Sequence, residues 1–241
     1  MLIKNMHKYV PISGVGALPA DATPFLGRMW LGPDGKVYRA RYVAKLAGVD
    51  AILYGIPVSS DGYTGDFEMD FKLNSDGIPT ATNVLFSSIQ GATKCFALQR
   101  TTSAIQQPQV VFRNLSTTVA ASLSPGNYSD AAWHRINVVK QGASAVVKID
   151  GTTFSSLNLS AWDPEVSTAH RFLGNSASGT STRVLICDYT LKRGSSLIIN
   201  SPMDDGSGTV VRDISGNGNN ATITDGSPTG VWAVDWVPIE F

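Results

Sequence analysis

The sequence is short of charge, and its few charges balance. Only 16% of the 241 residues are charged, and 19 basic residues face 19 acidic ones, whereas soluble domains average about 25% charged residues. A chain without net charge has no overall field to attract nucleic acid or an anionic membrane. We therefore expect neither of these as a partner.

Cysteine is also scarce. The two cysteines, Cys95 and Cys187, stand in apolar strand-like runs, where a free thiol behaves as a small hydrophobic group. Their number excludes a disulfide-rich scaffold, and their spacing matches neither a zinc site nor a redox motif. A single disulfide between them is left open.

Long apolar runs are missing as well. No stretch approaches the ~18 apolar residues that a membrane-spanning helix needs. The first residues, "MLIKNMHKYVPIS", lack the apolar block and small-residue cleavage site of a signal peptide. The expected product is a soluble protein made in the cytoplasm.

The sequence is rich in short alternating runs. In "GDFEMDFKLNSDG", apolar and polar residues alternate from Phe67 to Leu73, as in a half-buried strand. Similar runs follow at short intervals up to "GVWAVDWVPI", separated by Gly, Pro, Asn and Asp turns. No amphipathic helical stretch interrupts them. The pattern predicts an all-β, antiparallel sandwich or barrel over residues 61–241.

Residues 1–60 differ in character. "GPDGK" between two β-branched and aromatic runs predicts a β-hairpin, preceded by an extended arm around "ADATPFLG". We expect this segment to pack on a partner or on the main domain. The residues predicted to bury apolar surface in docking are Phe25, Met29, Trp30 and Tyr38.

Two later stretches carry a resemblance. "NYSDAAWHRINVVKQGASAVVKIDGTTFSS" (127–156), followed by "FLGN" (172–175) and "VLICDYTLKRG" (184–194), resembles the paired strands of concanavalin A-like, laminin-G-like jelly-roll sandwiches. "INSPMDDGSGTVVRDISGNGNNATI" (199–223) is similar to a phrase that opens many of these domains. The resemblance covers about residues 61–236. It implies that Trp133 inserts between the sheets, and that Gly142 and Asp150-Gly151 make turns.

The loop "RDISGNGNNATI" (212–223) has three interpretations. In the favoured one it holds its own backbone: Asp213 and Ser215 accept hydrogen bonds from nearby N–H groups, and residues 216–218 take left-handed conformations. A sugar or calcium site built on Asp213, Asn217 and Asn219 is the second, although calcium needs 6–8 oxygen ligands. A phosphate loop is disfavoured, because no Lys-Ser/Thr follows. We expect no metal and no cofactor, with calcium as the alternative.

Sites for sugars or for catalysis are few. Trp162, in the loop "SAWDPEV", is the best candidate for an exposed sugar-stacking ring, unless it plugs an edge of the sandwich. Glu68 and Asp70 in "FEMDF" resemble the paired carboxylates of polysaccharide-cutting enzymes. No aromatic partners accompany them, so we interpret them as a solvated strand face balanced by Lys72. An enzyme is not expected.

The resemblance implies three functions. The first is a non-enzymatic structural protein of a bacteriophage particle, a capsid decoration or a tail or fibre component. It would be an oligomer located in the virion and docked on other virion proteins through residues 1–60. The alternative is a lectin-like module that binds host or environmental glycans, and a glycan-degrading enzyme is a minor alternative.

Overall fold

A computed structural model describes residues 11–46, 51–55, 65–75, 83–89, 95–100, 108–114, 117–123, 130–162, 169–173, 184–224 and 232–239. These ranges form β-strands and one short 3-10 turn, Thr23–Phe25, with no α-helix among them. In this described part, no helix is long and apolar enough to cross a membrane. The expected all-β class is confirmed.

The first sheet has ten strands, in the order β1-β2-β3-β14-β5-β10-β11-β12, with β15 beside β14 and β18 beside β3. Apart from the parallel pair β1 and β2, its neighbours are antiparallel. Its strands are β1 (Ile12–Val15), β2 (Met29–Leu31), β3 (Val37–Leu46), β5 (Phe67–Ser75), β10 (Trp133–Gln141), β11 (Ser144–Ile149), β12 (Thr152–Asn158), β14 (Val184–Arg193), β15 (Ser196–Ser201) and β18 (Trp232–Pro238).

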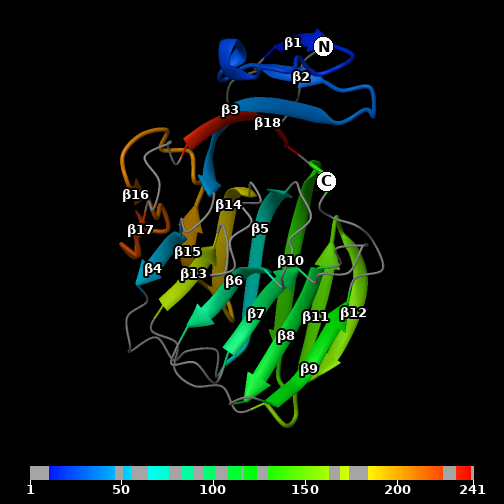
Figure 1. The fold of residues 1–241 in the computed structure, drawn as a ribbon, viewed down its shortest axis with the longest axis vertical. Coiled ribbons are helices and arrows are strands. Elements are labelled where there is room, and N and C mark those ends of the chain that lie inside the picture. Colours follow the sequence, from blue (N-terminus) through cyan, green and yellow to red (C-terminus); the bar gives the residue numbers. More distant parts are fainter. Residues whose placement is uncertain are drawn as a thin grey trace.

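The second sheet has eight antiparallel strands, in the order β16-β17-β4-β13-β6-β7-β8-β9. Figure 1 shows the two sheets lying face to face. The strands of the second sheet are β4 (Ala51–Gly55), β6 (Asn83–Ile89), β7 (Cys95–Arg100), β8 (Pro108–Asn114), β9 (Thr117–Leu123), β13 (Ala169–Leu173), β16 (Val210–Val211) and β17 (Ala221–Thr224).

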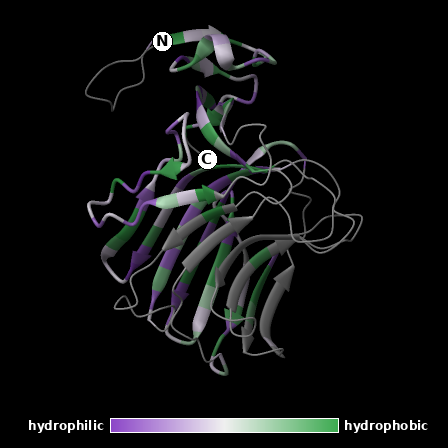
Figure 2. Cartoon of the chain, turned by 60° about the vertical axis from the view of Figure 1, so that its left-hand side comes forward, coloured by the Kyte–Doolittle hydropathy of each residue, from purple (hydrophilic) through white to green (hydrophobic). Residues whose placement is uncertain are grey.

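The main core lies between the sheets. Phe71 and Ile136 from the first sheet and Ile52 and Phe112 from the second belong to one buried apolar cluster. In β5 the residues from Phe67 to Leu73 with odd numbers are buried and those with even numbers are half-buried, which confirms the predicted alternation. Figure 2 shows hydrophilic and hydrophobic residues alternating along the described strands. Removing these apolar side chains from water is the main stabilising contribution to folding.

The expected turns are confirmed. Gly142, with φ of 54°, turns β10 into β11, and Asp150 and Gly151, with φ of 51° and 78°, turn β11 into β12. Two successive residues with positive φ are the signature of the tight turn that Asp-Gly favours. At "GPDGK", the predicted hairpin joins β2 to β3.

Trp133 does not insert between the sheets, so this expectation is wrong. Along β10, Ile136 and Val138 point into the main core, whereas Trp133 belongs to a second buried cluster with Leu185 and Val237. Because side chains alternate along a strand, Trp133 lies on the outer face of the first sheet, on the side opposite Ile136. There the C-terminal strand β18 covers it, and its Nε1 donates to Asp235 Oδ2 at 3.2 Å.

The N-terminal segment is partly built into the sandwich. β1, β2 and the first half of β3 lie beyond one end of the sandwich together with β18 (Figure 1). The last residues of β3 pair with β14, and β4 is a strand of the second sheet. The expected docking segment, residues 1–60, thus contributes part of β3 and all of β4 to the body of the sandwich.

The two cysteines lie in different sheets. Cys187 is a free, fully buried thiol in β14, and Cys95 begins β7. No disulfide involves Cys187. Burial raises the pKa of the Cys187 thiol well above its usual range, which keeps it unreactive.

Candidate functional site

The outer face of the first sheet carries a row of polar side chains. The buried face of β5 requires that Glu68, Asp70 and Lys72 point the other way, away from the second sheet. Strand pairing continues this row across neighbouring strands: Thr190 of β14 is opposite Asp70, Asp70 is opposite Asn137 of β10, and Asn137 is opposite Lys148 of β11. Three strand spacings separate the ends of this row, about 14 Å.

Three adjoining cavities follow these side chains. The largest, about 510 Å³, shares Glu68, Asp70 and Arg135 with a second of about 270 Å³ that reaches Lys148. A third, of about 120 Å³, shares Lys72 and other residues with the first and is closed by β18. We call the three together the outer groove. Its lining residues are Arg39, Arg41, Glu68, Asp70, Lys72, Arg135, Asn137, Lys148, Gly151, Asp188, Thr190, Lys192, Val237, Pro238 and Ile239.

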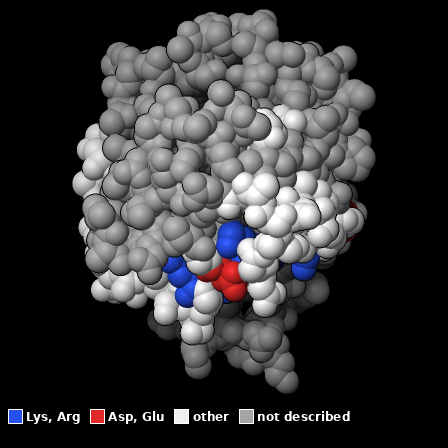
Figure 3. Space-filling model, turned by 90° about the horizontal axis from the view of Figure 1, so that it is seen from below, with Lys and Arg blue, Asp and Glu red and all other residues white. Residues whose placement is uncertain are grey.

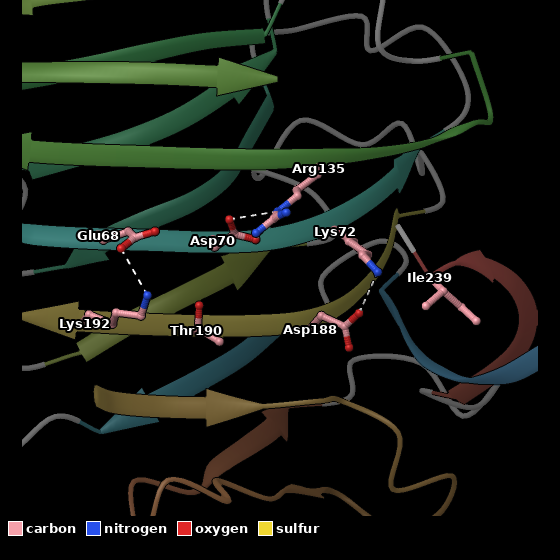
Figure 4. A pocket seen from close by; sticks show the side chains of 8 residues that line it. All are labelled: Glu68, Asp70, Lys72, Arg135, Asp188, Thr190, Lys192 and Ile239. Carbon is pink, nitrogen blue, oxygen red and sulfur yellow. Dashed lines mark hydrogen bonds and ion pairs between the residues drawn. The ribbon is translucent and has the colours of Figure 1, made fainter. Parts of the chain in front are cut away.

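Ion pairs tie the strands of the groove together (Figure 4). Arg135 Nε lies 2.9 Å from Asp70 Oδ1, and Lys192 Nζ lies 3.2 Å from Glu68 Oε2. The side-chain amide of Asn137 donates to both carboxylates, at 3.2 Å to Glu68 and 3.0 Å to Asp70. Arg135 thus pairs directly with Asp70, and Lys192 pairs directly with Glu68.

A β-bulge shapes one end of the groove. Between Cys187 and Thr190 the register of β14 against β5 shifts, and Asp188 takes a left-handed conformation with φ of 56°. Bulges re-aim side chains next to functional sites. The bulge turns Asp188 toward two cations, with Oδ1 2.6 Å from Arg41 Nη1 and Oδ2 3.1 Å from Lys72 Nζ.

The C-terminal strand forms the wall at this end. Lys72 Nζ donates to the carbonyl oxygen of Pro238 at 2.8 Å. The N–H of Ile239 donates to the carbonyl oxygen of Val37 at 2.9 Å. Ile239 lies beside Lys72 and Asp188 at the edge of the cavity in Figure 4. The groove is therefore bounded by a fixed segment.

The groove is polar and more basic than acidic. Among its described lining residues, six carry positive charge and three carry negative charge, and none is aromatic. Seen from below, acidic and basic side chains of the described residues lie next to one another (Figure 3). Such a surface can bind hydroxyl and charged groups by hydrogen bonds but offers no ring for stacking.

The loop 212–220 is a turn held by hydrogen bonds within itself and to β15. Asp213 Oδ1 accepts hydrogen bonds from the N–H groups of Asn200 and Ser215, both at 2.9 Å, and Oδ2 accepts from Ser215 Oγ and the Asn219 N–H. Burial tends to raise the pKa of Asp213, but these hydrogen bonds outweigh it and hold the pKa below 3.8. The carboxylate has no oxygen left over for a ligand.

The amides of this loop are engaged in the same way. Asn217 Nδ2 donates to the carbonyl oxygens of Leu197 and Ile198, and Asn219 Nδ2 donates to that of Ile198. Gly216 and Gly218 have positive φ as expected, but Asn217 is not among the residues with positive φ, contrary to the prediction.

No calcium cluster forms in this region. Asp204 approaches Arg41 at 3.4 Å, and Asp205 pairs with Arg212. Within the described ranges, no three His, Cys, Asp or Glu residues come together as metal ligands.

Trp162 is buried rather than exposed, which corrects the expectation of a sugar-stacking ring. Only 8% of its surface is accessible, and its ring meets Phe112 edge to face at 4.8 Å between centroids. It plugs an edge of the sandwich, the alternative considered for a loop tryptophan.

The predicted docking residues pack within the chain. The Phe25 ring lies 5.8 Å from Trp30 and 5.6 Å from Trp236 of β18, and Met29 is 1% exposed. The Tyr38 hydroxyl donates a hydrogen bond to Oδ2 of Asp34 at 2.8 Å. These residues thus contact one another and β18, and Phe25, Trp30 and Tyr38 are half-buried.

Several groove residues were not predicted as site residues from the sequence. Arg135, Lys148, Asp188 and Lys192 were not singled out, and Glu68 and Asp70 were considered only as catalytic carboxylates. One signal was present: the two-residue turn after Gln141 places Asn137 opposite Lys148 on the strand face away from the core.

No protein-family model and no curated protein matches the sequence. Solved structures do match. The binding domain of botulinum neurotoxin DC, in complex with rat synaptotagmin II, superposes with a TM-score of 0.51 at 10% identity over 66% of this chain and 44% of that one.

A second structure is the receptor binding domain of botulinum neurotoxin mosaic serotype C/D, with tetraethylene glycol bound on its Hcn sub-domain. It gives a TM-score of 0.51 at 12% identity over 68% of this chain and 45% of that one. The chain thus spans less than half the length of either structure. These likenesses show the fold alone, a concanavalin A-like jelly-roll sandwich.

Proposed function

We propose that this chain is a non-enzymatic, lectin-like recognition module that binds a saccharide along the outer groove. The observation that carries the proposal is the row from Thr190 to Lys148, in which hydroxyl, carboxylate, amide and ammonium groups from four strands line one continuous depression. Saccharides are recognised by such convergent hydrogen-bonding groups. The two matched structures are named as binding domains, and this supports recognition as the general activity.

The carboxylates of the groove suit binding better than catalysis. Glu68 and Asp70 each accept hydrogen bonds from a cation and from the amide of Asn137. A glycosidase needs one carboxyl group free to protonate the leaving oxygen and a second free to attack or to activate water. Groups held in this way act as fixed acceptors, so we propose no hydrolytic activity.

A glycan array tests the proposal. The wild-type protein is expected to retain a defined set of saccharides, and Thr190→Tyr, which places a ring in the middle of the groove, is expected to lose them. The matched control is Thr222→Tyr on the outer face of the second sheet, where Thr222 is exposed between two buried neighbours. Equal binding by the groove variant and the control, or no glycan binding by the wild type, would reject the proposal.

Residence in a bacteriophage particle is a separate proposal. A binding module of this kind would serve on a virion surface, and the half-buried Phe25, Trp30 and Tyr38 would supply part of the docking surface. Copurification with particles through a density gradient tests it, and a protein found only free of particles would exclude it.

A further inference from the structure

The groove has positive charge left over beside Glu68 and Asp70. Glu68 and Asp70 are each matched by one cation, Lys192 and Arg135. Lys148 lies in the same cavity, half-buried, and no ion pair is recorded for it among the described residues. It is the third cation beside two carboxylates.

Arg135 also has unused donors there. Its Nε donates to Asp70. Its two Nη atoms make no hydrogen bond to another residue within the described ranges. Its side chain is 48% exposed and lines the same cavity as Lys148. An arginine fork binds a carboxylate through two parallel hydrogen bonds, and an ammonium adds a point charge.

We propose that the cavity between Arg135 and Lys148 binds the carboxylate of an acidic sugar. This inference rests on the proposed saccharide-binding function and specifies its ligand class. The cavity volume of about 270 Å³ accommodates one sugar ring. The carboxylate faces Arg135 and Lys148, while neighbouring hydroxyls donate to Glu68 and Asp70, which are present as acceptors beside it.

Neutralisation explains why the two groove carboxylates do not repel such a ligand. Asp70 meets Arg135 and Asn137, and Glu68 meets Lys192 and Asn137, so the field at the cavity is set by Lys148. Because the cavity is open to solvent, we expect binding to weaken as salt rises.

The test is an array that carries uronate and sialylated glycans beside neutral glycans of similar size. The wild type is expected to retain carboxylated glycans at least tenfold more tightly than neutral ones. Lys148→Gln should remove most of this preference, and Lys148→Arg should keep it. The control Arg28→Gln removes an exposed positive charge from the N-terminal hairpin and should bind as the wild type does.

The outcomes separate the two proposals. Equal retention of neutral and acidic glycans would overturn this inference and leave the lectin-like function standing, whereas no retention of either would overturn both. Unchanged binding by Lys148→Gln would place the carboxylate elsewhere. Displacement by sodium acetate at an equal carboxylate concentration would mean that the site takes any free carboxylate, which also overturns the inference.

Discussion

Asp188 and Arg41, 147 residues apart in sequence, lie in contact, with Oδ1 of the carboxylate 2.6 Å from Nη1 of the guanidinium. The contact depends on the β-bulge that turns Asp188 out of the regular strand. The same carboxylate holds Lys72, so one side chain neutralises two cations whose side chains are only 18% and 12% exposed.

Removal of the Asp188 carboxylate should therefore destabilise the fold. We expect Asp188→Ala to lower the free energy of unfolding by about 2 kcal/mol, a value reduced for the partial exposure of the carboxylate. Asp188→Asn, which tolerates the left-handed backbone, should lose less. Urea unfolding measures both; equal stability of Asp188→Ala and the wild type would show that the bulge needs no charge.

Asp213 is predicted to be a structural residue and not a ligand. Asp213→Ala leaves four donors without their acceptor and should cost about 2–3 kcal/mol, measured by chemical denaturation. Because its pKa is lowered in the folded state, this contribution is complete above about pH 4 and is lost as the pH falls through the lowered value.

Addition of calcium tests whether the same loop is a metal site instead. Millimolar calcium should leave the melting temperature of the wild type unchanged, since Asp213 has no free oxygen. A rise in melting temperature that disappears in Asp213→Ala would contradict this interpretation and restore the calcium site.

His134 bridges two acidic groups near the start of β10. Its Nδ1 lies 2.7 Å from Asp150 and its Nε2 lies 3.0 Å from Asp130. Burial acts to lower the pKa of His134, but the hydrogen bonds to Asp150 and Asp130 outweigh it and raise the pKa above 6.5.

A raised histidine pKa stabilises the protein below pH 6.5, and the stabilisation is lost as the pH rises through the folded-state value. His134→Gln should thus cost about 1 kcal/mol at pH 5.5, after allowance for solvent screening, and less at pH 9. Unfolding curves of both proteins at the two pH values measure this difference. A cost that does not change with pH would mean that the histidine acts only by packing.

Trp162 should contribute to stability and not to glycan binding. Its buried Nε1 has no recorded hydrogen-bond partner, so Trp162→Phe loses packing but no hydrogen bond and should cost less than about 1.5 kcal/mol. Trp162→Ala should cost about 3–5 kcal/mol because it opens a cavity beside Phe112. Thermal unfolding and the glycan array together check this: weaker glycan retention by a stably folded Trp162→Phe would return the ring to the binding site.

The N-terminal strands should be required for folding. A protein without residues 1–45 loses Ala40, Val43 and Ala44, each with 0% exposure, and exposes the paired edges of β14 and β18. We expect this variant to be insoluble or to lack the cooperative unfolding transition of the full chain. A truncated protein with a cooperative transition would make residues 1–45 separable from the sandwich.

The sequence was sufficient to predict the features that depend on local structure. The alternation from Phe67 to Leu73 and the turns at Gly142 and Asp150 depend on side-chain period and backbone conformation, and all are confirmed. Trp133 was misplaced because a buried ring was expected between the sheets, whereas its spacing of three residues from Ile136 places it on the outer face. Only the position of β18, a hundred residues later, decides which face is covered.

The groove could not be predicted from the sequence for a related reason. Arg135 and Asp70 are 65 residues apart, and Glu68 and Lys192 are 124 apart, so their pairing requires the strand order and register of the sheet. The bulge at Asp188 has no distinctive composition. The loop 212–220, by contrast, is rich in Asn and Gly and was considered as a ligand site, although its polar groups bond to its own backbone and to that of β15.

The most direct test of the account is hydrogen–deuterium exchange of the wild-type protein with and without the glycan that binds best on the array. Slower exchange is expected in β5, β10, β11 and β14, around the outer groove. Protection confined to residues 197–220, or to the hairpin of β2 and β3, would contradict it and place the binding surface elsewhere.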